Sequence, residues 1–482
     1  MMPENIDFEK LKAKVATGLR VWTDSRKVRP GEVFVALPGV RVDGNSFIPD
    51  ALENGAAYVL GGPDAKLPDG AKATLVIHER PRQALGELAA AHFGDPSSKV
   101  ELIGITGTNG KTTVSYLLEH MLSRAGRRVG VIGTISYRWP GFHLDAPLTT
   151  PDCWQIHELL SNMLESGVDT VIMECSSHAL HQERLAGLKF DAAVLTNVTQ
   201  DHLDYHGTMD HYFRAKSRLF LDQPQDGKIG IINFDDSYGR MLLHQHENTI
   251  GYGLEYPNVG GGPGLTGYIK RYDRKGLHLA MSYEGQRWEI KSPLVGRFNA
   301  SNLMGAQAVG LALGLRPRRL QALESFNGVP GRLERVPNKR GLDVFVDYAH
   351  TPDALENALS ALKELDFKRV ICLFGCGGNR DKSKRPLMGE AVCRYADVAV
   401  VTSDNPRDED PVDIMNDIKP GLTTCAGVME EPRRRKAIAL AIEEMEAGDC
   451  LLIAGKGHET YQEIKGRRYP FSDVEAAREL LA

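Results

Sequence analysis

Short apolar runs alternate with helix-like stretches along most of the 482-residue chain. Several runs are rich in Val and Ile and apolar throughout, which is typical of strands that helices cover on both faces of a parallel sheet. The alternation of strand and helix favours βαβ units and therefore an α/β fold. The predicted strands are residues 102–106, 129–132, 170–174, 192–195, 230–233, 343–347, 369–374, 398–402 and 450–454.

Two turn-forming clusters divide the chain into candidate domains. Residues 94–98 (Gly-Asp-Pro-Ser-Ser) and 327–331 (Asn-Gly-Val-Pro-Gly) each precede a predicted strand. Because domains usually have about 100–200 residues, we predict three α/β domains, at residues 1–98, 99–330 and 331–482. A glycine-rich stretch at residues 258–267 predicts a flexible loop in the middle domain.

Charge and cysteine content narrow the class of protein. A net charge of -5 argues against a general nucleic-acid or membrane-surface binder. The N-terminus lacks the apolar core of a signal peptide, and no apolar run reaches about 18 residues, so we predict no transmembrane helix and a cytoplasmic protein. The seven cysteines include no CxxC pair, which predicts that all are reduced.

A glycine-rich segment at residues 104–113 gives the sharpest local signal, because it lies between a predicted strand and a predicted helix. Glycines let backbone N–H groups approach phosphates, and a helix N-terminus favours negative charge. Lys111 is expected to neutralise phosphate charge and Thr112 to bind Mg²⁺. The spacing departs from the usual phosphate loop, since Ile105 stands where its first glycine is expected. The alternative is a glycine turn without a ligand.

Three further residues are candidates for a metal site. Glu174 ends a predicted strand, His202 follows another, and Lys216 lies in an amphipathic helical pattern. A carboxylate at the C-terminal end of a parallel strand points toward the crevice where ligands bind. Taken singly, Glu174 and His202 are as well explained as hydrogen-bonded polar residues, and Lys216 as a solvated helix lysine.

Several motifs together resemble the Mur ligase family, and the resemblance covers almost the whole chain. They are residues 107–112 (Gly-Thr-Asn-Gly-Lys-Thr), 174–178 (Glu-Cys-Ser-Ser-His), 197–204 (Asn-Val-Thr-Gln-Asp-His-Leu-Asp), 296–302 (Gly-Arg-Phe-Asn-Ala-Ser-Asn), 404–407 (Asp-Asn-Pro-Arg) and 455–459 (Gly-Lys-Gly-His-Glu). The resemblance implies a UDP-binding N-terminal domain, a P-loop-like central ATPase domain and a Rossmann-like C-terminal domain that binds an amino acid.

The resemblance also implies an activity. ATP would phosphorylate the D-glutamate side-chain carboxylate of UDP-N-acetylmuramoyl-L-alanyl-D-glutamate, and the amine of meso-diaminopimelate would attack the acyl phosphate. One Mg²⁺ would be bound by Thr112 and Glu174, and a second by His202 and by Lys216, the last as a carbamate formed with CO₂. Lys111 would stabilise the transferred phosphoryl group. We expect a monomer that binds neither nucleic acid nor a membrane.

The remaining site residues carry over by their motifs. The nucleotide would contact Gly107, Thr108, Asn109, Gly110, Lys111, Thr112, Thr113, Asn299, Arg332 and Asp347. The UDP-sugar dipeptide would contact Thr23, Ser25, Thr149, Thr150, Ser176, Gln182 and Arg184. The incoming amino acid would contact Arg380, Asp404, Asn405, Pro406, Arg407, Gly455 and Glu459.

Arg407 is expected to select the amino acid. Diaminopimelate has a second carboxylate that lysine lacks, and a guanidinium can bind it through two hydrogen bonds. Two positions depart from the family pattern. Leu148 stands where relatives often have Asn, which removes one substrate hydrogen bond, and Arg433-Arg434 replaces the commoner Asp-Arg. The plain alternative for Arg433 and its neighbours is a solvated helix face.

Other assignments stay open on the sequence. Within the same superfamily these are a ligase that adds D-alanyl-D-alanine and a folylpolyglutamate synthetase, both disfavoured by residues 404–407 and 455–459. A different class is a regulatory module that hydrolyses ATP to change shape. That class predicts no amine substrate and gives Glu174, His202 and Arg407 no common role.

Overall fold

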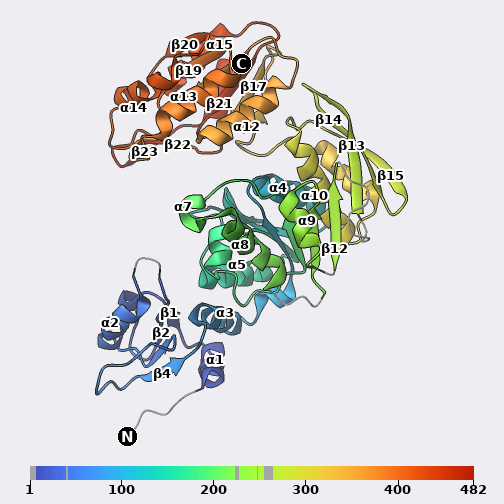
Figure 1. Ribbon diagram of the computed structural model, residues 1–482. Coiled ribbons are helices and arrows are strands. Elements are labelled where there is room, and N and C mark those ends of the chain that lie inside the picture. Colours follow the sequence, from blue (N-terminus) through green and yellow to red (C-terminus); the bar gives the residue numbers. More distant parts are fainter. Residues whose placement is uncertain (1–6, 40–41, 223–226, 247, 255–263) are drawn as a thin grey trace. The chain divides into compact units, whose positions relative to one another are not determined.

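The computed structural model describes residues 7–39, 42–222, 227–246, 248–254 and 264–482 (Figure 1). The chain forms two compact units. The first comprises the chain up to residue 266 together with 304–320, and the second comprises 267–303 and 321–482.

The first unit begins with a small parallel sheet. Its strands are β1 (Val21–Trp22), β2 (Val33–Val35), β3 (Tyr58–Gly61) and β4 (Thr74–Ile77), in that order. Its helices are α1 (Phe8–Ala16), α2 (Ile48–Glu53) and α3 (Pro81–His92). Alternate strand residues face opposite layers: Val33 packs with Leu11 and Leu88 of α1 and α3, whereas Phe34 packs with Ile48 of α2.

A larger sheet forms the rest of the first unit. Its parallel strands, in spatial order, are β12 (Thr249–Gly253), β11 (Ile229–Asn233), β10 (Ala192–Leu195), β5 (Glu101–Thr106), β9 (Thr170–Glu174) and β6 (Val129–Ile132), followed by antiparallel β7 (Ser136–Trp139) and β8 (Phe142–Asp145). The helices are α4 (Lys111–Arg124), α5 (Cys153–Glu165), α6 (Ser177–His181), α7 (Leu203–His206), α8 (Met209–Leu221), α9 (Ser237–Leu243) and α11 (Pro317–Leu320). Because β5 lies between β9 and β10, the segments that follow these three strands meet at one edge.

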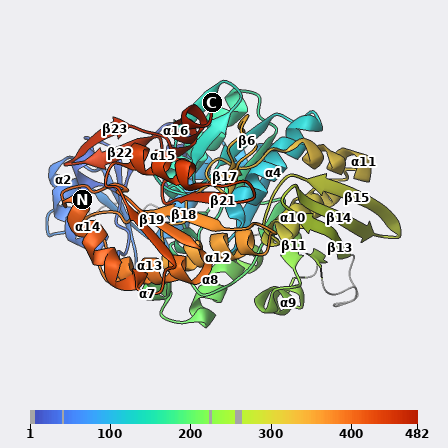
Figure 2. The same ribbon diagram turned by 90° about the horizontal axis from the view of Figure 1, so that it is seen from above.

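The second unit contains a mostly parallel sheet with helices on both faces. Its strand order is β16 (Glu334–Arg335), β17 (Asp343–Asp347), β21 (Cys450–Ala454), β18 (Val370–Phe374), β19 (Val398–Val401) and β20 (Gly427–Glu430); Figure 2 shows β17, β21, β18 and β19 side by side. Helices α12 (Pro352–Lys363), α13 (Lys384–Tyr395) and α14 (Pro411–Ile418) cover one face. Helices α15 (Arg434–Glu444) and α16 (Asp473–Leu480) cover the other.

Smaller elements complete the chain. Strand β13 (Gly264–Asp273) pairs with β12 at its start, β14 (Gly276–Tyr283) and β15 (Gln286–Ser292) form a hairpin, α10 (Phe298–Ala312) follows, and β22 (Tyr461–Ile464) pairs with β23 (Arg467–Pro470). The 3₁₀ helices are η1 (Ser25–Lys27), η2 (Gly44–Phe47), η3 (Pro96–Lys99), η4 (Gln321–Ser325) and η5 (Lys419–Leu422).

The α/β class and all nine predicted strands are confirmed, each within a parallel part of a sheet. Of the predicted glycine-rich loop, residues 258–263 lie outside the described residues. The rest of that prediction is wrong, because β13 already begins at Gly264. Within the ranges described above, no helix combines the length and the apolar character needed to cross a membrane.

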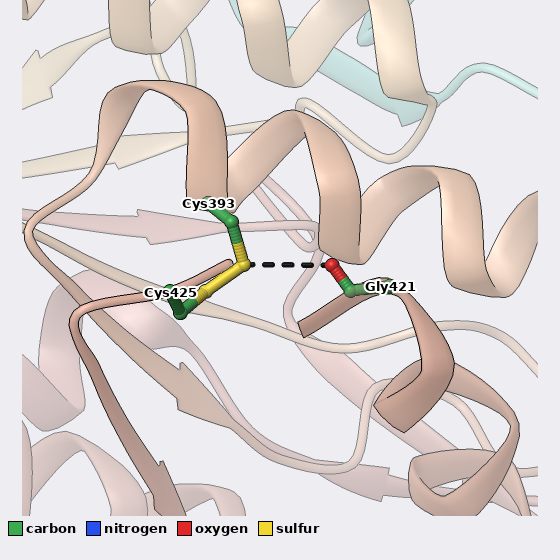
Figure 3. The surroundings of a disulfide bond; sticks show 3 residues. All are labelled: Cys393, Gly421 and Cys425. Atoms are coloured by element: carbon green, nitrogen blue, oxygen red, sulfur yellow. Dashed lines mark hydrogen bonds between the residues drawn. A yellow bond between two sulfur atoms is a disulfide. The ribbon is translucent and has the colours of Figure 1, made fainter. Parts of the chain in front are cut away.

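The expectation that all seven cysteines are reduced is wrong for two of them. Cys393 in α13 and Cys425 ahead of β20 form a disulfide, with their Cα atoms 4.5 Å apart, and the Cys393 sulfur lies 3.5 Å from the Gly421 carbonyl oxygen (Figure 3). These cysteines are 32 residues apart in sequence, and only the tertiary fold brings them together. The other five cysteines are free and buried.

Candidate active site

The glycine-rich segment forms a tight loop between β5 and α4. Gly107 has a φ of +145°, and a Cβ there would stand 1.9 Å from the Thr196 hydroxyl oxygen, so only glycine fits. Lys111 folds back over the loop, and its Nζ donates to the carbonyl oxygens of Gly107 at 2.8 Å and Thr108 at 2.9 Å. The loop therefore has the strand–loop–helix context of a phosphate site.

The segment after β10 braces this loop, a role that sequence reasoning missed. The backbone N–H of Asn109 donates to the Asn197 side-chain oxygen at 2.9 Å, and that of Thr108 donates to the Asn197 carbonyl at 2.9 Å. The Thr196 hydroxyl donates to the Asn109 carbonyl at 2.6 Å. Asn197 was part of a motif, but its bracing contact depends on β10 lying beside β5.

Glu174 lies at the end of β9 and is almost wholly buried. Its Oε2 accepts from the hydroxyls of Thr112 at 2.9 Å and Thr134 at 2.8 Å, and its Oε1 accepts from the Thr134 backbone N–H at 3.1 Å. The Thr134 hydroxyl is also 3.2 Å from that of Thr149. The structure thus joins the predicted metal ligands Thr112 and Glu174, and it adds Thr134, which no sequence motif marked.

Lys216 is buried inside the protein, so a solvated helix lysine is excluded for this position. Its Nζ donates to the Gly107 carbonyl at 2.8 Å, the same oxygen that Lys111 contacts, and lies 4.3 Å from the centre of the Tyr212 ring. Burial and the nearby Lys111 charge hold the pKa of Lys216 well below its ordinary value. A lowered pKa favours the neutral, nucleophilic form of an amine.

Among the described residues, no hydrogen bond joins His202 to the other three candidate ligands, although its ring centre lies 6.3 Å from that of Tyr212, which Lys216 contacts. The His202 backbone is left-handed, with a φ of +53°, and its side chain is about half exposed. Its Nε2 lies 3.6 Å from an Asp201 oxygen, and its ring centre lies 4.8 Å from that of His178. In the part of the chain that the structure describes, no three His, Cys, Asp or Glu side chains gather as metal ligands.

Four of the predicted dipeptide contacts form a cluster against the Glu174 backbone. The Thr150 hydroxyl donates to the Glu174 carbonyl at 2.8 Å and lies 3.3 Å from the Ser176 hydroxyl. Arg184 donates to the Thr150 carbonyl at 3.0 Å and to the Gln182 side-chain oxygen at 2.6 Å. These four candidates are therefore held together by direct contacts.

Two predicted substrate residues lie in the N-terminal sheet region. Ser25 is buried, and its carbonyl accepts from the Asn54 side chain at 3.1 Å, whereas Thr23 is exposed. No hydrogen bond between described residues joins either of them to the Thr150 cluster. Leu148, at the position that departs from the family, has 51% of its surface exposed.

Three predicted nucleotide contacts belong to the second unit. Asp347 ends β17, and its oxygens accept from the backbone N–H groups of Leu333 at 2.7 Å and Ala349 at 2.8 Å. Burial raises the pKa of Asp347. The Arg332 guanidinium lies 5.3 Å from the centre of the Tyr348 ring. Asn299 is buried in α10, where its amide donates to the Val295 carbonyl at 2.7 Å.

The predicted amino-acid contacts converge in the loops after β19 and β21. The Asn405 amide donates to a Glu459 oxygen at 2.9 Å. Gly455 has a φ of +114°, and a Cβ there would lie 2.6 Å from an Asp404 oxygen. A Cβ on Gly378 would meet the Pro406 carbonyl at 1.9 Å, so the glycine loop after β18 closes tightly on this segment.

Arg407 has a left-handed backbone, with a φ of +52°, and its Nη1 donates to the Gly378 carbonyl at 2.7 Å. Arg380 is exposed in the same glycine loop. The solvated-face alternative fits Arg433, which pairs with Glu431 at 3.0 Å, but it is wrong for Arg434, whose side chain is fully buried. Only the tertiary fold distinguishes these two adjacent arginines.

These features define the class: an α/β enzyme with a glycine loop in the strand–loop–helix context of a phosphate site and a buried carboxylate beside it. Three family models match the chain, described as "Mur ligase family, catalytic domain" at residues 20–93, "Mur ligase middle domain" at 105–310 and "Mur ligase, glutamate ligase domain" at 331–457. The chain belongs to the Mur ligase family.

Named relatives support this membership. A UDP-N-acetylmuramoyl-L-alanyl-D-glutamate--2,6-diaminopimelate ligase from Lawsonia intracellularis is 52% identical over 95% of each chain. A protein of the same name from Synechococcus elongatus is 44% identical over 97% of this chain and 94% of its own. A solved structure with that name has a TM-score of 0.69 and 34% identity, and the match covers 96% of this chain and 94% of the other.

A more distant solved structure shares the fold. The MurF ligase from Thermotoga maritima in complex with ADP has a TM-score of 0.60 at 21% identity and 97% coverage of both chains. At this identity the likeness concerns the fold alone.

Proposed function

We propose that this chain is an ATP-dependent ligase of peptidoglycan synthesis that joins meso-2,6-diaminopimelate to the D-glutamate side-chain carboxylate of UDP-N-acetylmuramoyl-L-alanyl-D-glutamate. The products are the UDP-N-acetylmuramoyl tripeptide, ADP and phosphate. The observation that carries this proposal is the match, over 95% of each chain, to a relative named for that reaction. The contact between Asn405 and Glu459 supports it, because a carboxylate held in this way can accept from the ammonium group of an amino acid.

The chemistry explains why ATP is needed. A carboxylate does not react with an amine at neutral pH, because its oxygen is a poor leaving group. In the proposed reaction the carboxylate oxygen attacks the γ-phosphorus of ATP, and ADP leaves. The amine nitrogen then attacks the acyl carbon, the tetrahedral intermediate expels phosphate, and the nitrogen loses a proton.

Lys111 and the loop amides would carry the first step. Two anions must approach each other when the carboxylate attacks ATP, and positive charge in a site of low dielectric offsets their repulsion. The Lys111 Nζ now donates to two loop carbonyls, which a phosphate would replace as acceptors. The UDP-sugar dipeptide would be positioned by the cluster of Thr150, Ser176 and Arg184, which lies against the Glu174 backbone.

The donor set beside the loop fits Mg²⁺. The Thr112 hydroxyl and the buried Glu174 carboxylate are hard oxygen ligands 2.9 Å apart, which suits this cation. Lys216, as a neutral amine, can take up CO₂ with loss of a proton and so become an anionic oxygen ligand. We propose Thr112 and Glu174 as ligands of one Mg²⁺, and His202 and Lys216 as its carbamate as ligands of a second. Bound Mg²⁺ would screen the charge that develops on the phosphoryl group.

The domain division and the setting of the protein are also proposals. We propose functional domains at residues 1–98, 99–330 and 331–482, supported by the three family segments at 20–93, 105–310 and 331–457. We further propose that the protein is cytoplasmic, because ATP and a nucleotide-linked precursor are its substrates, and that it is a monomer. Light scattering on the purified protein measures the oligomeric state directly.

The deciding experiment measures phosphate release with ATP, Mg²⁺ and UDP-N-acetylmuramoyl-L-alanyl-D-glutamate, with either meso-diaminopimelate or L-lysine as the amine. Release that requires diaminopimelate is the expected result. Release with lysine keeps the ligase but overturns the role of Arg407. Release with neither, from folded protein, contradicts the proposal and favours another family activity or the regulatory module.

A further inference from the structure

Lys456 is a fully buried lysine in the loop after β21, and nothing in the proposed reaction has used it so far. Its Nζ donates to the Glu459 Oε2 at 2.9 Å and to the Asn405 side-chain oxygen at 3.1 Å. Its Nζ also lies 5.6 Å from the centre of the Tyr461 ring. A buried ammonium is costly unless it is paired and hydrogen-bonded, so its position between these two residues needs a reason.

The contacts of Lys456 fix the orientation of both partners. The Asn405 oxygen accepts from Lys456 and from the Glu463 backbone N–H at 2.9 Å. The amide nitrogen of Asn405 must therefore point to the other side, where it donates to the Glu459 Oε2 at 2.9 Å. The lysine and the Glu463 N–H are thus the two donors that hold the Asn405 oxygen on this side, and removing the lysine leaves only one of them.

The same contacts select which Glu459 oxygen a ligand meets. The Lys456 ammonium and the Asn405 amide both donate to Oε2. We therefore expect an incoming ammonium group to meet Oε1. Glu459 keeps about a fifth of its side chain exposed, whereas Lys456 has none, so a ligand can reach the carboxylate but not the lysine.

A second buried cation, Arg434, holds the backbone of the same region. It forms two hydrogen bonds of 2.7 Å with the buried Asp473, and it donates to the carbonyls of Ser403 at 3.2 Å and Ala454 at 2.8 Å. Ser403 precedes the first residue of the Asp-Asn-Pro-Arg loop, and Ala454 precedes Gly455. Arg434 thus fixes the two strand ends, and Lys456 fixes the side chains that project from them.

We propose that Lys456 is a positioning residue for the incoming amino acid: it holds Asn405 and Glu459 as one preformed receptor for an ammonium group without touching the ligand. This inference rests on the proposed function. In this proposal the lysine of the Gly-Lys-Gly-His-Glu motif contributes to binding although it contacts no substrate atom. Such preorganisation lowers the cost of binding, because the receptor groups need not be ordered when the ligand enters.

The test compares Lys456→Met, Lys456→Arg and Glu459→Gln by steady-state phosphate release. Methionine keeps the length and apolar stem but removes the ammonium. We expect the KM for diaminopimelate to rise roughly tenfold to hundredfold in Lys456→Met, with kcat changed less and the KM values for ATP and the UDP-dipeptide within about twofold. Lys456→Arg keeps a cationic donor and should recover part of the loss.

A double-mutant cycle separates positioning from general stability. Because Lys456 is proposed to act through its two partners, Lys456→Met should add little to Glu459→Gln in the double variant. Lys419→Met is the matched control, since Lys419 pairs with Glu430 on the surface of the same unit at 3.0 Å. Its KM for diaminopimelate should equal that of the wild type.

Each outcome supports or contradicts the positioning role of Lys456. Wild-type protein that releases no phosphate with diaminopimelate contradicts the proposed function, and the lysine is then not at issue. Active wild type with an unchanged KM in Lys456→Met overturns the positioning role. Equal rises in the KM of all three substrates, or loss of the folded state in both Lys456 variants by circular dichroism, makes Lys456 a purely structural residue and overturns the proposal as well.

Discussion

The Arg407 Nε lies 3.4 Å from the Glu463 Oε2, so the cation proposed to select diaminopimelate already has an anionic neighbour. The backbones are joined too, since the Arg407 N–H donates to the Glu463 carbonyl at 3.1 Å. Both side chains are about one-quarter exposed, which makes their ion pair weak and replaceable. A carboxylate from the ligand can therefore compete for the guanidinium.

Arg407→Gln should weaken use of diaminopimelate and not of lysine. Glutamine removes the charge that pairs with the distal carboxylate, and a charged hydrogen bond of this kind is worth about 2–3 kcal/mol. We expect kcat/KM for diaminopimelate to fall by roughly 30- to 150-fold, while the low activity with L-lysine is unchanged. Arg433→Gln, on the surface beside Glu431, is the control. Equal losses with both amines would argue against selection by Arg407.

Glu463→Gln should have the opposite effect. Without the Glu463 charge, the ligand carboxylate no longer competes with another anion for the Arg407 guanidinium. Glutamine keeps the size of the side chain. Because the ion pair is partly exposed, we expect a modest fall in the KM for diaminopimelate, about two- to fivefold. Competition experiments with L-lysine should show the same gain in selectivity. A raised KM would mean that Glu463 serves to hold Arg407 in place.

Lys216 should carry a carbamate under CO₂. Its Nζ shares the Gly107 carbonyl with Lys111, and two ammonium groups there would repel each other. Burial and the nearby Lys111 charge lower the pKa of Lys216, which favours the free amine that reacts with CO₂. ¹³C NMR of protein equilibrated with ¹³C-bicarbonate should show one carbamate signal that Lys216→Met lacks. Full activity without such a signal in the wild type would exclude the carbamate as a ligand.

The strands were predictable because they are buried on both faces and therefore apolar throughout. The β7–β8 hairpin was not, since all four residues of β8 (Phe142–Asp145) are exposed and carry no such signal. Antiparallel β14 and β15 were not predicted for a related reason, because exposed polar residues interrupt the apolar run of β15 at every second position. Strand pairing at an edge depends on a neighbour that the local sequence does not identify.

Some residues of the candidate site were predictable from the sequence and others were not. Local motifs pointed to Thr112, Glu174 and the Asn405 loop, because phosphate loops and strand ends have recognisable patterns. Thr134 escaped, since it reaches Glu174 only through the neighbouring strand β6. The buried cations were not predicted either. In the sequence Lys456 resembles an ordinary loop lysine, and only the fold places it between the Asn405 amide oxygen and the Glu459 carboxylate.

Glu174→Gln should abolish most of the activity without unfolding the protein. Glutamine preserves the shape and can still accept from the Thr112 and Thr134 hydroxyls, but it lacks the charge that would bind Mg²⁺. We expect kcat to fall by more than about 100-fold and the Mg²⁺ concentration for half-maximal activity to rise. Glu158→Gln on the exposed face of α5 is the control. Unchanged Mg²⁺ dependence would contradict the metal role.

His157 should make the first unit sensitive to acid. It is fully buried in α5, its Nε2 lies 3.3 Å from the Ala186 carbonyl oxygen, and burial lowers its pKa from 6.5 to about 4. Below pH 6.5 the unfolded chain binds the proton more readily than the folded chain does. Stability from this residue is therefore complete above pH 6.5 and is lost as the pH falls toward 4, by about 2 kcal/mol at pH 5.

His157→Gln removes this titration and keeps an N–H donor for the Ala186 carbonyl. The free energy of unfolding should accordingly fall less between pH 7.5 and pH 5 in the variant than in the wild type. Urea unfolding followed by tryptophan fluorescence at both pH values measures the difference. His143→Gln, at an exposed position of β8, should keep the wild-type slope. Equal losses in wild type and His157→Gln would show that the protonation of His157 does not differ between the folded and unfolded states. Other groups would then cause the acid sensitivity.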